Sequence, residues 1–179
     1  ETIMSVKNNY FWTEKAALSD FIANGDMLEI TRIFSYEEAF GLRFADIAVR
    51  FADRTEATEI ELTVILDTLL DDRASLDGER QNRLYEELYA FYSQDCSNKA
   101  IIKQAIKQDK HYNALQIKFA NALTCHKAQG GDWQTVFIQQ GFFSDDMLDT
   151  EYFRWLYTAV TRAKEKLYLV NFTEDFFAD

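Results

Sequence analysis

The sequence predicts an α/β protein with a β-rich first part, a helical middle and a last part in which strands and helices alternate. Three observations support this fold class. Residues 1–72 hold short runs of β-branched and aromatic residues between turn residues. Residues 73–110 repeat apolar side chains at helical spacing. Residues 111–179 alternate strand and helix patterns, which is typical of a parallel sheet covered by helices.

The first segment, 1–72, is expected to form a small β-barrel of SH3-like type. Turn signals at Asn24-Gly25, Gly41 and Asp53 separate its strands, and short strands joined by tight turns favour a barrel. The predicted strands are Thr2–Val6, Leu28–Phe34, Phe44–Phe51 and Thr58–Leu66. An aromatic and amide cluster could stack on a base, but packing in the barrel is the favoured interpretation; it comprises Asn8, Asn9, Tyr10 and Trp12.

The second segment, 73–110, is predicted to be a helical appendage of two helices. Leu84, Leu88 and Phe91 form an apolar stripe in the first helix, and Ser97 is the expected N-cap of the second. One face of the second helix is basic and could contact phosphates, although a solvated face is the favoured interpretation; its residues are Lys99, Lys103, Lys107 and Lys110.

Composition limits the class of protein. Of 179 residues, 47% are hydrophobic and 15% aromatic, which is enough to fill real cores. No apolar run approaches the ~18–20 residues of a membrane helix. Cys96 and Cys125 lack a CxxC spacing, so we expect free thiols in a reducing cytoplasm and no metal site. A chain that begins at Glu1 in place of Met is expected to be a segment of a longer protein.

The net charge of −11 has the wrong sign for generic nucleic-acid binding. The excess of acidic residues is distributed unevenly along the chain. The net charge is −9 for residues 1–72, +1 for residues 73–110 and −3 for residues 111–179. Contact with DNA would therefore depend on a few individual side chains rather than on a basic face. This is expected if the chain forms one wall of a DNA channel and another domain forms the opposite wall.

The first candidate site is a polar loop between two predicted strands, Ile117–Ala122 and Trp133–Ile138. Adjacent Gly130 and Gly131 permit positive φ and a close approach of backbone to a ligand. In parallel α/β sheets, ligands bind where loops leave the carboxyl ends of strands, and this loop is expected to follow such an end.

The second candidate site lies in Asp149–Val170, which reads as a helix followed by a short strand at Lys166–Asn171. An apolar stripe of Phe153, Leu156, Tyr157, Val160 and Ala163 is expected to be buried. The other side of the helix carries Arg154, Thr158, Thr161 and Arg162, and Arg162 falls at the end of the helix.

Together, TCHKAQGGDW at 124–133 and RWLYTAVTRAKEKLYLV at 154–170 resemble motifs V and VI of superfamily 1 DNA helicases. The similarity is greatest to the branch that contains the exodeoxyribonuclease V alpha subunit, and it covers most of Tyr112–Val170. Upstream, Phe21–Asp26 and Gly41–Phe51 resemble the β-barrel insert of such helicases. The resemblance implies a UvrD-like C-terminal domain in which 111–179 is the second RecA-like motor domain, with a parallel sheet.

The resemblance also implies residue roles. Arg162 matches the motif VI arginine that reaches the ATP γ-phosphate, and it is the implied catalytic residue. ATP with Mg²⁺ would be bound mainly by the N-terminal RecA-like domain of the same parent chain. Gln129, Gly130 and Asp132 match the nucleotide-facing part of motif V, although many relatives have Glu at the position of Asp132. The implied contacts to single-stranded DNA are Thr124, His126 and Lys127.

The implied function is ATP-driven translocation along single-stranded DNA, with recombination or repair subunits as further partners. The isolated segment is expected to be inactive, because it has no GxxxxGK[ST] phosphate loop. One alternative is a non-catalytic interaction module that keeps the helicase fold. A second, an enzyme with Cys125 as nucleophile and His126 as base, is disfavoured because neighbours on an extended segment point to opposite faces.

Overall fold

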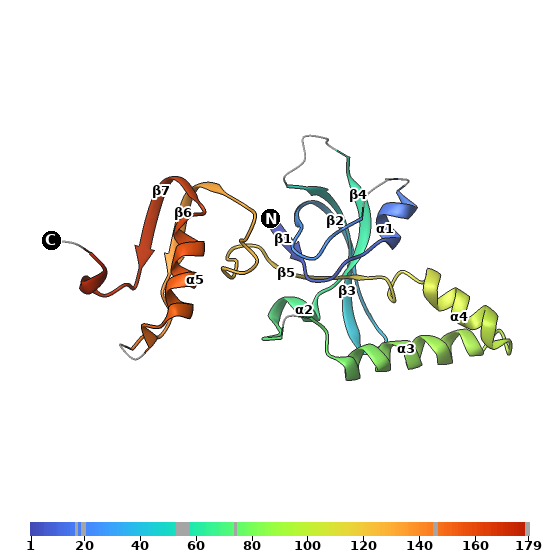
Figure 1. The fold of residues 1–179 in the computed structure, drawn as a ribbon. Coiled ribbons are helices and arrows are strands. Elements are labelled where there is room, and N and C mark those ends of the chain that lie inside the picture. Colours follow the sequence, from blue (N-terminus) through green and yellow to red (C-terminus); the bar gives the residue numbers. More distant parts are fainter. Residues whose placement is uncertain (17, 19–20, 53–57, 74, 145–146, 178–179) are drawn as a thin grey trace. The chain divides into compact units, whose positions relative to one another are not determined.

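The computed structural model describes residues 1–16, 18, 21–52, 58–73, 75–144 and 147–177 (Figure 1). The chain divides into two compact units, Glu1–Asn121 and Ala122–Asp179. The first holds a closed barrel and helices, and the second holds a parallel pair of strands and a helix. The segment limits at 72 and 110 that the sequence suggested both fall inside the first unit.

The barrel in the first unit has five strands in the order β1-β2-β3-β4-β5. Neighbouring strands are antiparallel except β4 and β5, which are parallel, and β5 pairs back to β1 to close the barrel. The strands are β1 Thr2–Ser5, β2 Met27–Ala39, β3 Leu42–Phe51, β4 Ile60–Ile65 and β5 Leu115–Phe119. The prediction of a β-barrel is confirmed, although its fifth strand lies outside the predicted segment 1–72, and its SH3-like type stays a prediction.

Local sequence explains the turns of the barrel. Ala39 pairs with Leu42, so Phe40 and Gly41 alone form the β2–β3 loop, with φ of 52° and 69°. Two positive φ values are those of a type I′ turn, which matches the twist of the strands that it joins. Asn24-Gly25 also forms a turn, and Gly25 has φ 102°. The turn predicted at Asp53 lies outside the described residues.

The strand at Leu115–Phe119 corrects the sequence-based expectation for the last segment. The strand predicted at Ile117–Ala122 is expected to begin the parallel α/β sheet, but the observed strand is Leu115–Phe119 and completes the barrel next to β1 and β4. Leu115 and Ile117 are buried in the barrel core with residues of β3 and β4. The reason is topological: four strands precede the helical segment 67–108, and the strand that closes the barrel follows it. The helical segment is thus an insertion between β4 and β5.

The helices of the first unit are α1 Phe11–Lys15, α2 Asp67–Leu70, α3 Gly78–Ser93 and α4 Lys99–Gln108 (Figure 1). Leu84 and Leu88 of α3 are buried as predicted, whereas Phe91 is exposed. The predicted N-cap at Ser97 is wrong, because the side chain of Asn98 accepts the hydrogen bond from the Ala100 N–H at 2.9 Å. Lys110 is not part of a solvated basic face, since it pairs with Glu37 and Asp46.

The aromatic and amide cluster at residues 8–12 packs within the first unit. Asn9 and Trp12 both donate side-chain hydrogen bonds to the Asn113 carbonyl, at 2.9 and 2.8 Å. The Asn8 side chain accepts from the Asn24 N–H, and the Tyr10 ring stacks on Phe21. These contacts agree with the favoured interpretation of this cluster as packing and turn residues.

The second unit is a strand–helix–strand arrangement. Strands β6 Trp133–Gln139 and β7 Ala163–Val170 are parallel, α5 Thr150–Val160 connects them, and the 3-10 helix η2 Glu174–Phe176 follows. The predicted order and the parallel pairing are confirmed. The full RecA-like sheet is not shown, since the described sheet here has two strands and the barrel is a mixed sheet.

The apolar stripe predicted for α5 is only partly buried. Ala159 is buried and Leu156 and Val160 are half-buried, but Phe153 and Tyr157 are 56% and 70% exposed. Two strands cover a narrow band of a helix, so residues at the margin of the stripe stay in contact with solvent. Among the described residues, no helix combines the length and the apolar character needed to cross a bilayer.

Candidate functional site

The segment before β6 is a series of tight turns. The Lys127 N–H donates to the Thr124 carbonyl at 3.0 Å, the Gln129 N–H to His126 at 3.3 Å, and the Gly131 N–H to Ala128 at 3.2 Å. Cys125 and His126 are therefore not on an extended segment, which corrects the geometry used to argue against a Cys–His pair. This turn (residues 124–131) carries most of the residues assigned to motif V.

The two glycines of the turn serve different needs. Gly130 has φ 86°, a conformation that side chains disfavour. At Gly131 an added Cβ would lie 2.6 Å from the ring of Trp133, so a side chain there would have to displace that ring. One glycine thus supplies backbone freedom and the other supplies space.

The turn lies at the amino ends of the parallel strands. The Trp133 N–H donates to the Arg162 carbonyl at 2.9 Å, and Trp133 is the register partner of Ala163. Both residues begin their strands. The expectation that this loop would leave the carboxyl end of a strand in the same sheet is therefore wrong, because the preceding strand, β5, belongs to the barrel.

Arg162 joins the two candidate motifs. Its guanidinium donates to the Thr158 carbonyl at 3.0 Å, the Gly131 carbonyl at 2.9 Å and the Thr161 hydroxyl at 3.1 Å. The bond to Thr158 satisfies a carbonyl at the end of α5, and the bond to Gly131 reaches the turn. Within the described residues Arg162 forms no ion pair, and these bonds engage three of its five N–H donors.

Asp132 has a different partner. Its carboxylate pairs with the Lys164 ammonium of β7 at 2.8 Å, and both side chains are about half exposed, at 57% and 51%. An exposed pair of this kind contributes roughly 0–1 kcal/mol, so a competing ligand could replace it at little cost.

Cys125 does not have the character of a nucleophile. Burial raises the pKa of its thiol, and the positive charge of Arg162 opposes this only in part. Its Sγ lies 3.4 Å from the Trp155 carbonyl, to which the S–H donates. A thiol with a raised pKa is protonated at neutral pH and reacts slowly. The disfavoured Cys–His enzyme is thus opposed by electrostatics rather than by backbone geometry.

The assigned DNA-contacting residues lie at the surface of the turn: Thr124, His126 and Lys127 are exposed. His126 and Gln129 also line a hollow of about 430 Å³ between the turn and α5. Its other lining residues are Cys125, Glu151, Tyr152, Arg154, Trp155 and Thr158. Of these, sequence reasoning noted the position of Arg154 and Thr158 on the polar side of the helix but assigned no role to either.

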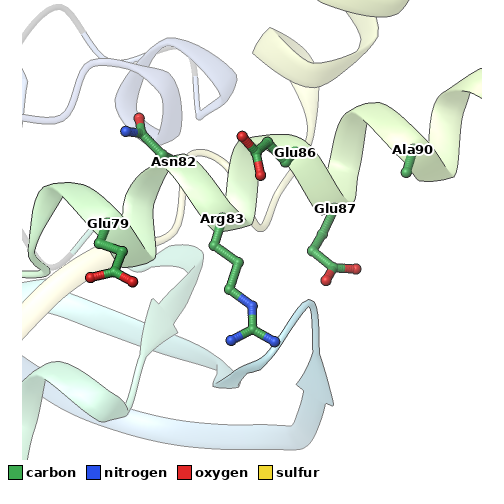
Figure 2. A pocket seen from close by; sticks show the side chains of 6 residues that line it. All are labelled: Glu79, Asn82, Arg83, Glu86, Glu87 and Ala90. Atoms are coloured by element: carbon green, nitrogen blue, oxygen red, sulfur yellow. The ribbon is translucent and has the colours of Figure 1, made fainter.

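A larger hollow, of about 550 Å³, lies along α3 in the first unit. Figure 2 shows its side chains, with Arg83 extending toward the β2–β3 hairpin. The lining residues are Glu79, Asn82, Arg83, Glu86, Glu87 and Ala90. Three carboxylates against one cation disfavour a nucleotide or nucleic-acid ligand. Among the described residues no group of three or more His, Cys, Asp or Glu side chains is placed to hold a metal ion.

Comparisons with known proteins find a similarity over the segment that contains both candidate motifs. Residues 119–170 match the family model of the UvrD-like helicase C-terminal domain. Over 148 residues, or 70% of this chain, the sequence is 28% identical to a probable DNA helicase II homolog of Mycoplasma capricolum subsp. capricolum. The chain spans 20% of the length of that relative. The segment that holds the turn, α5 and Arg162 is thus similar to the UvrD-like helicase C-terminal domain.

Proposed function

We propose that this chain is the C-terminal portion of an ATP-dependent DNA helicase or translocase of the exodeoxyribonuclease V alpha-like branch. In this proposal Arg162 senses the ATP γ-phosphate and the turn contacts single-stranded DNA. The observation that carries the proposal is the 2.9 Å hydrogen bond from the Arg162 guanidinium to the Gly131 carbonyl. That bond links the end of α5 directly to the turn.

Arg162 has the chemistry that phosphoryl transfer requires. Negative charge on the transferred phosphoryl group is spread over its oxygens, and a planar guanidinium that is always charged can stabilise it. Three donors hold the side chain in place through Thr158, Thr161 and Gly131, and the remaining N–H groups can bind an anion. A fixed guanidinium needs little reorganisation when the phosphate arrives.

The residues present fit one side of an ATP site. Gln129 and Gly130 are exposed on the turn, and Asp132 can exchange Lys164 for ribose hydroxyls because their ion pair is exposed. ATP and its Mg²⁺ would be held mainly by the N-terminal RecA-like domain of the parent chain. Bound ATP would supply the phosphoryl group. This chain would supply the Arg162 guanidinium, which orients the γ-phosphate, and the backbone of the turn, which faces the nucleotide.

The turn offers a route for coupling. Thr124, His126 and Lys127 precede Gln129 and Gly130 within the same hydrogen-bonded turn. When the remaining N–H groups of Arg162 bind the γ-phosphate, its retained bond to the Gly131 carbonyl can transmit a small displacement of the guanidinium to the turn. The contacts between the turn and the DNA backbone would then change with the nucleotide state. Recombination or repair subunits as partners and a cytoplasmic location complete the proposal.

The first test is Arg162→Ala in the full-length parent protein. DNA-stimulated ATP hydrolysis is expected to fall by about 10³-fold, as is typical when an arginine that contacts the γ-phosphate is removed. Single-stranded DNA binding without nucleotide is expected to stay within about twofold of wild type, because Arg162 contacts the nucleotide side of the turn. Arg162→Lys should also lose most of the rate, since an ammonium cannot form the same planar fork.

Lys166→Ala is the control, since Lys166 is an exposed cation of β7 in the same unit. It should hydrolyse ATP at the wild-type rate. Unchanged turnover in Arg162→Ala would remove Arg162 from the ATP site. If wild-type protein shows no DNA-stimulated hydrolysis, the non-catalytic module that keeps the helicase fold becomes the better description.

A further inference from the structure

The hollow between the turn and α5 has two walls of different origin. His126 and Gln129 come from the turn, whereas Arg154, Trp155 and Thr158 come from one side of α5. Its volume of about 430 Å³ is within the range of small-ligand sites, so it can admit one nucleotide unit of a longer strand.

The groups inside the hollow are suited to an anion beside an apolar ring. The Thr158 hydroxyl donates to the Arg154 carbonyl at 2.8 Å, and the Cys125 thiol donates to the Trp155 carbonyl, so these two are engaged in holding the helix and turn. The exposed side chains here include the Arg154 guanidinium, the His126 imidazole, the Gln129 amide and the Glu151 carboxylate. Glu151 is the one carboxylate in the lining.

The present partner of Arg154 is weakly held. Its guanidinium lies 3.6 Å from the Glu151 carboxylate, and the two side chains are 75% and 85% exposed. Such a pair contributes little to stability. A phosphate can accept two parallel hydrogen bonds from a guanidinium, which is a stronger arrangement. Arg154 is therefore able to exchange Glu151 for a phosphate at small cost.

We infer that Arg154 binds a backbone phosphate of single-stranded DNA in this hollow, across from His126, with Trp155 as the apolar wall against the adjoining sugar or base. The inference rests on the proposed function, which assigns the turn to single-stranded DNA. It adds α5 to the DNA-binding surface. Glu151 competes with the phosphate and limits the affinity.

The test is binding of a fluorescent oligodeoxythymidylate to the full-length parent protein, by anisotropy, over a series of salt concentrations. Arg154→Ala is expected to raise Kd roughly three- to tenfold at low salt. It should also reduce the slope of log K against log salt by about 0.7, the value for one phosphate contact on a single strand. Glu151→Gln should lower Kd by about two- to threefold. Alanine is a good helix former, so α5 is expected to persist.

Lys166→Ala is the matched control and should leave Kd and slope unchanged. An unchanged Kd and slope in Arg154→Ala would overturn the inference while the Arg162 result stands. A weaker Kd with an unchanged slope would overturn it as well, since that indicates a structural effect rather than a lost phosphate contact. Failure of wild-type protein to bind the oligonucleotide would instead refute the proposed function, and the inference with it.

Discussion

At the residue scale, His111 is a largely buried titratable group of the first unit with a carboxylate at each ring nitrogen. Its Nδ1 lies 3.2 Å from the Asp109 carboxylate and its Nε2 lies 3.1 Å from Glu37, and the side chain is 10% exposed. Burial lowers the pKa of His111, but the hydrogen bonds to Asp109 and Glu37 outweigh it and raise the pKa above 6.5. The protonated imidazole therefore holds two carboxylates together.

The neighbours of His111 titrate outside the neutral range. Hydrogen bonds from His111 and Lys110 lower the pKa of Glu37 below 4.5. Burial raises the pKa of Asp109, but its hydrogen bonds to His111 and Tyr92 lower it below 3.8 overall. Burial and the Asp109 contact raise the pKa of Tyr92 to about 12. At pH values between the low pKa values of Glu37 and Asp109 and the high pKa of Tyr92, His111 is the one of these four groups whose charge changes.

His111→Gln should make the stability of the first unit less dependent on pH. A folded-state pKa above the unfolded value means that His111 stabilises the fold fully below pH 6.5, and that this contribution is lost as pH rises through the folded pKa. The free energy of unfolding of wild type should exceed that of the variant by about 1–3 kcal/mol at pH 5.5. The excess should shrink toward pH 9, as measured by urea unfolding.

His126→Gln is the control for this measurement, because His126 belongs to the second unit and is not a member of the His111 cluster. It should leave the pH dependence of the first unit as in wild type. A difference between wild type and His111→Gln that stays constant from pH 5.5 to 9 would contradict the assigned role of the imidazolium.

At the element scale, polar side chains begin three helices. Asp77, Asn98 and Asp149 each accept a hydrogen bond from a backbone N–H in the first turn of α3, α4 and α5. These bonds satisfy N–H groups that have no partner within the helix. Ser97 and Asn98 are both good capping residues, so sequence alone could not choose between them.

Asn98→Ala should destabilise the first unit by about 1 kcal/mol, because it removes the acceptor for the Ala100 N–H. Ser97→Ala should change the free energy of unfolding by less than about 0.5 kcal/mol, as expected for an exposed surface position. Urea unfolding of the two variants side by side measures both values. A larger effect for Ser97→Ala than for Asn98→Ala would move the start of α4 by one residue.

At the scale of the whole molecule, helices α3 and α4 share an apolar cluster with the barrel, beside a second cluster that fills the barrel interior. Phe44 and Ile65 of the barrel lie in one apolar cluster with Leu88 of α3 and with Ile102 and Ile106 of α4. The helical insertion is thus part of the folding unit rather than a loosely attached appendage. Residues 122–179 form a second compact unit.

Leu88→Ala should therefore destabilise the barrel as well as the helices. Leu88 is fully buried, and truncation of such a leucine costs about 2–5 kcal/mol. Hydrogen exchange of the β3 and α3 amides should accelerate together, while the β6 and β7 amides should exchange as in wild type. Phe91→Ala, at an exposed position of the same helix, is the control and should cost less. Faster exchange confined to α3 and α4 would show that the helices unfold separately.

The sequence by itself determined the elements whose signals are local. Strands β1 to β4, the turns at Gly25 and Gly41, the two helices of the insertion and the strand–helix–strand order of the second unit all follow from periodicity and turn residues within short windows. The position of Arg162 just after α5 was determined in the same way, because one helical register places it there.

Only the tertiary structure decided where Leu115–Phe119 pairs, which side of α5 is buried and what Arg162 and Arg154 contact. An apolar run of five residues has the same local pattern in a barrel as in a parallel sheet, and long-range pairing with β1 and β4 makes the choice. The hydrogen bond from Arg162 to Gly131 and the hollow beside His126 likewise join residues that are distant in sequence. Such contacts depend on how the elements pack against each other, which local periodicity does not specify.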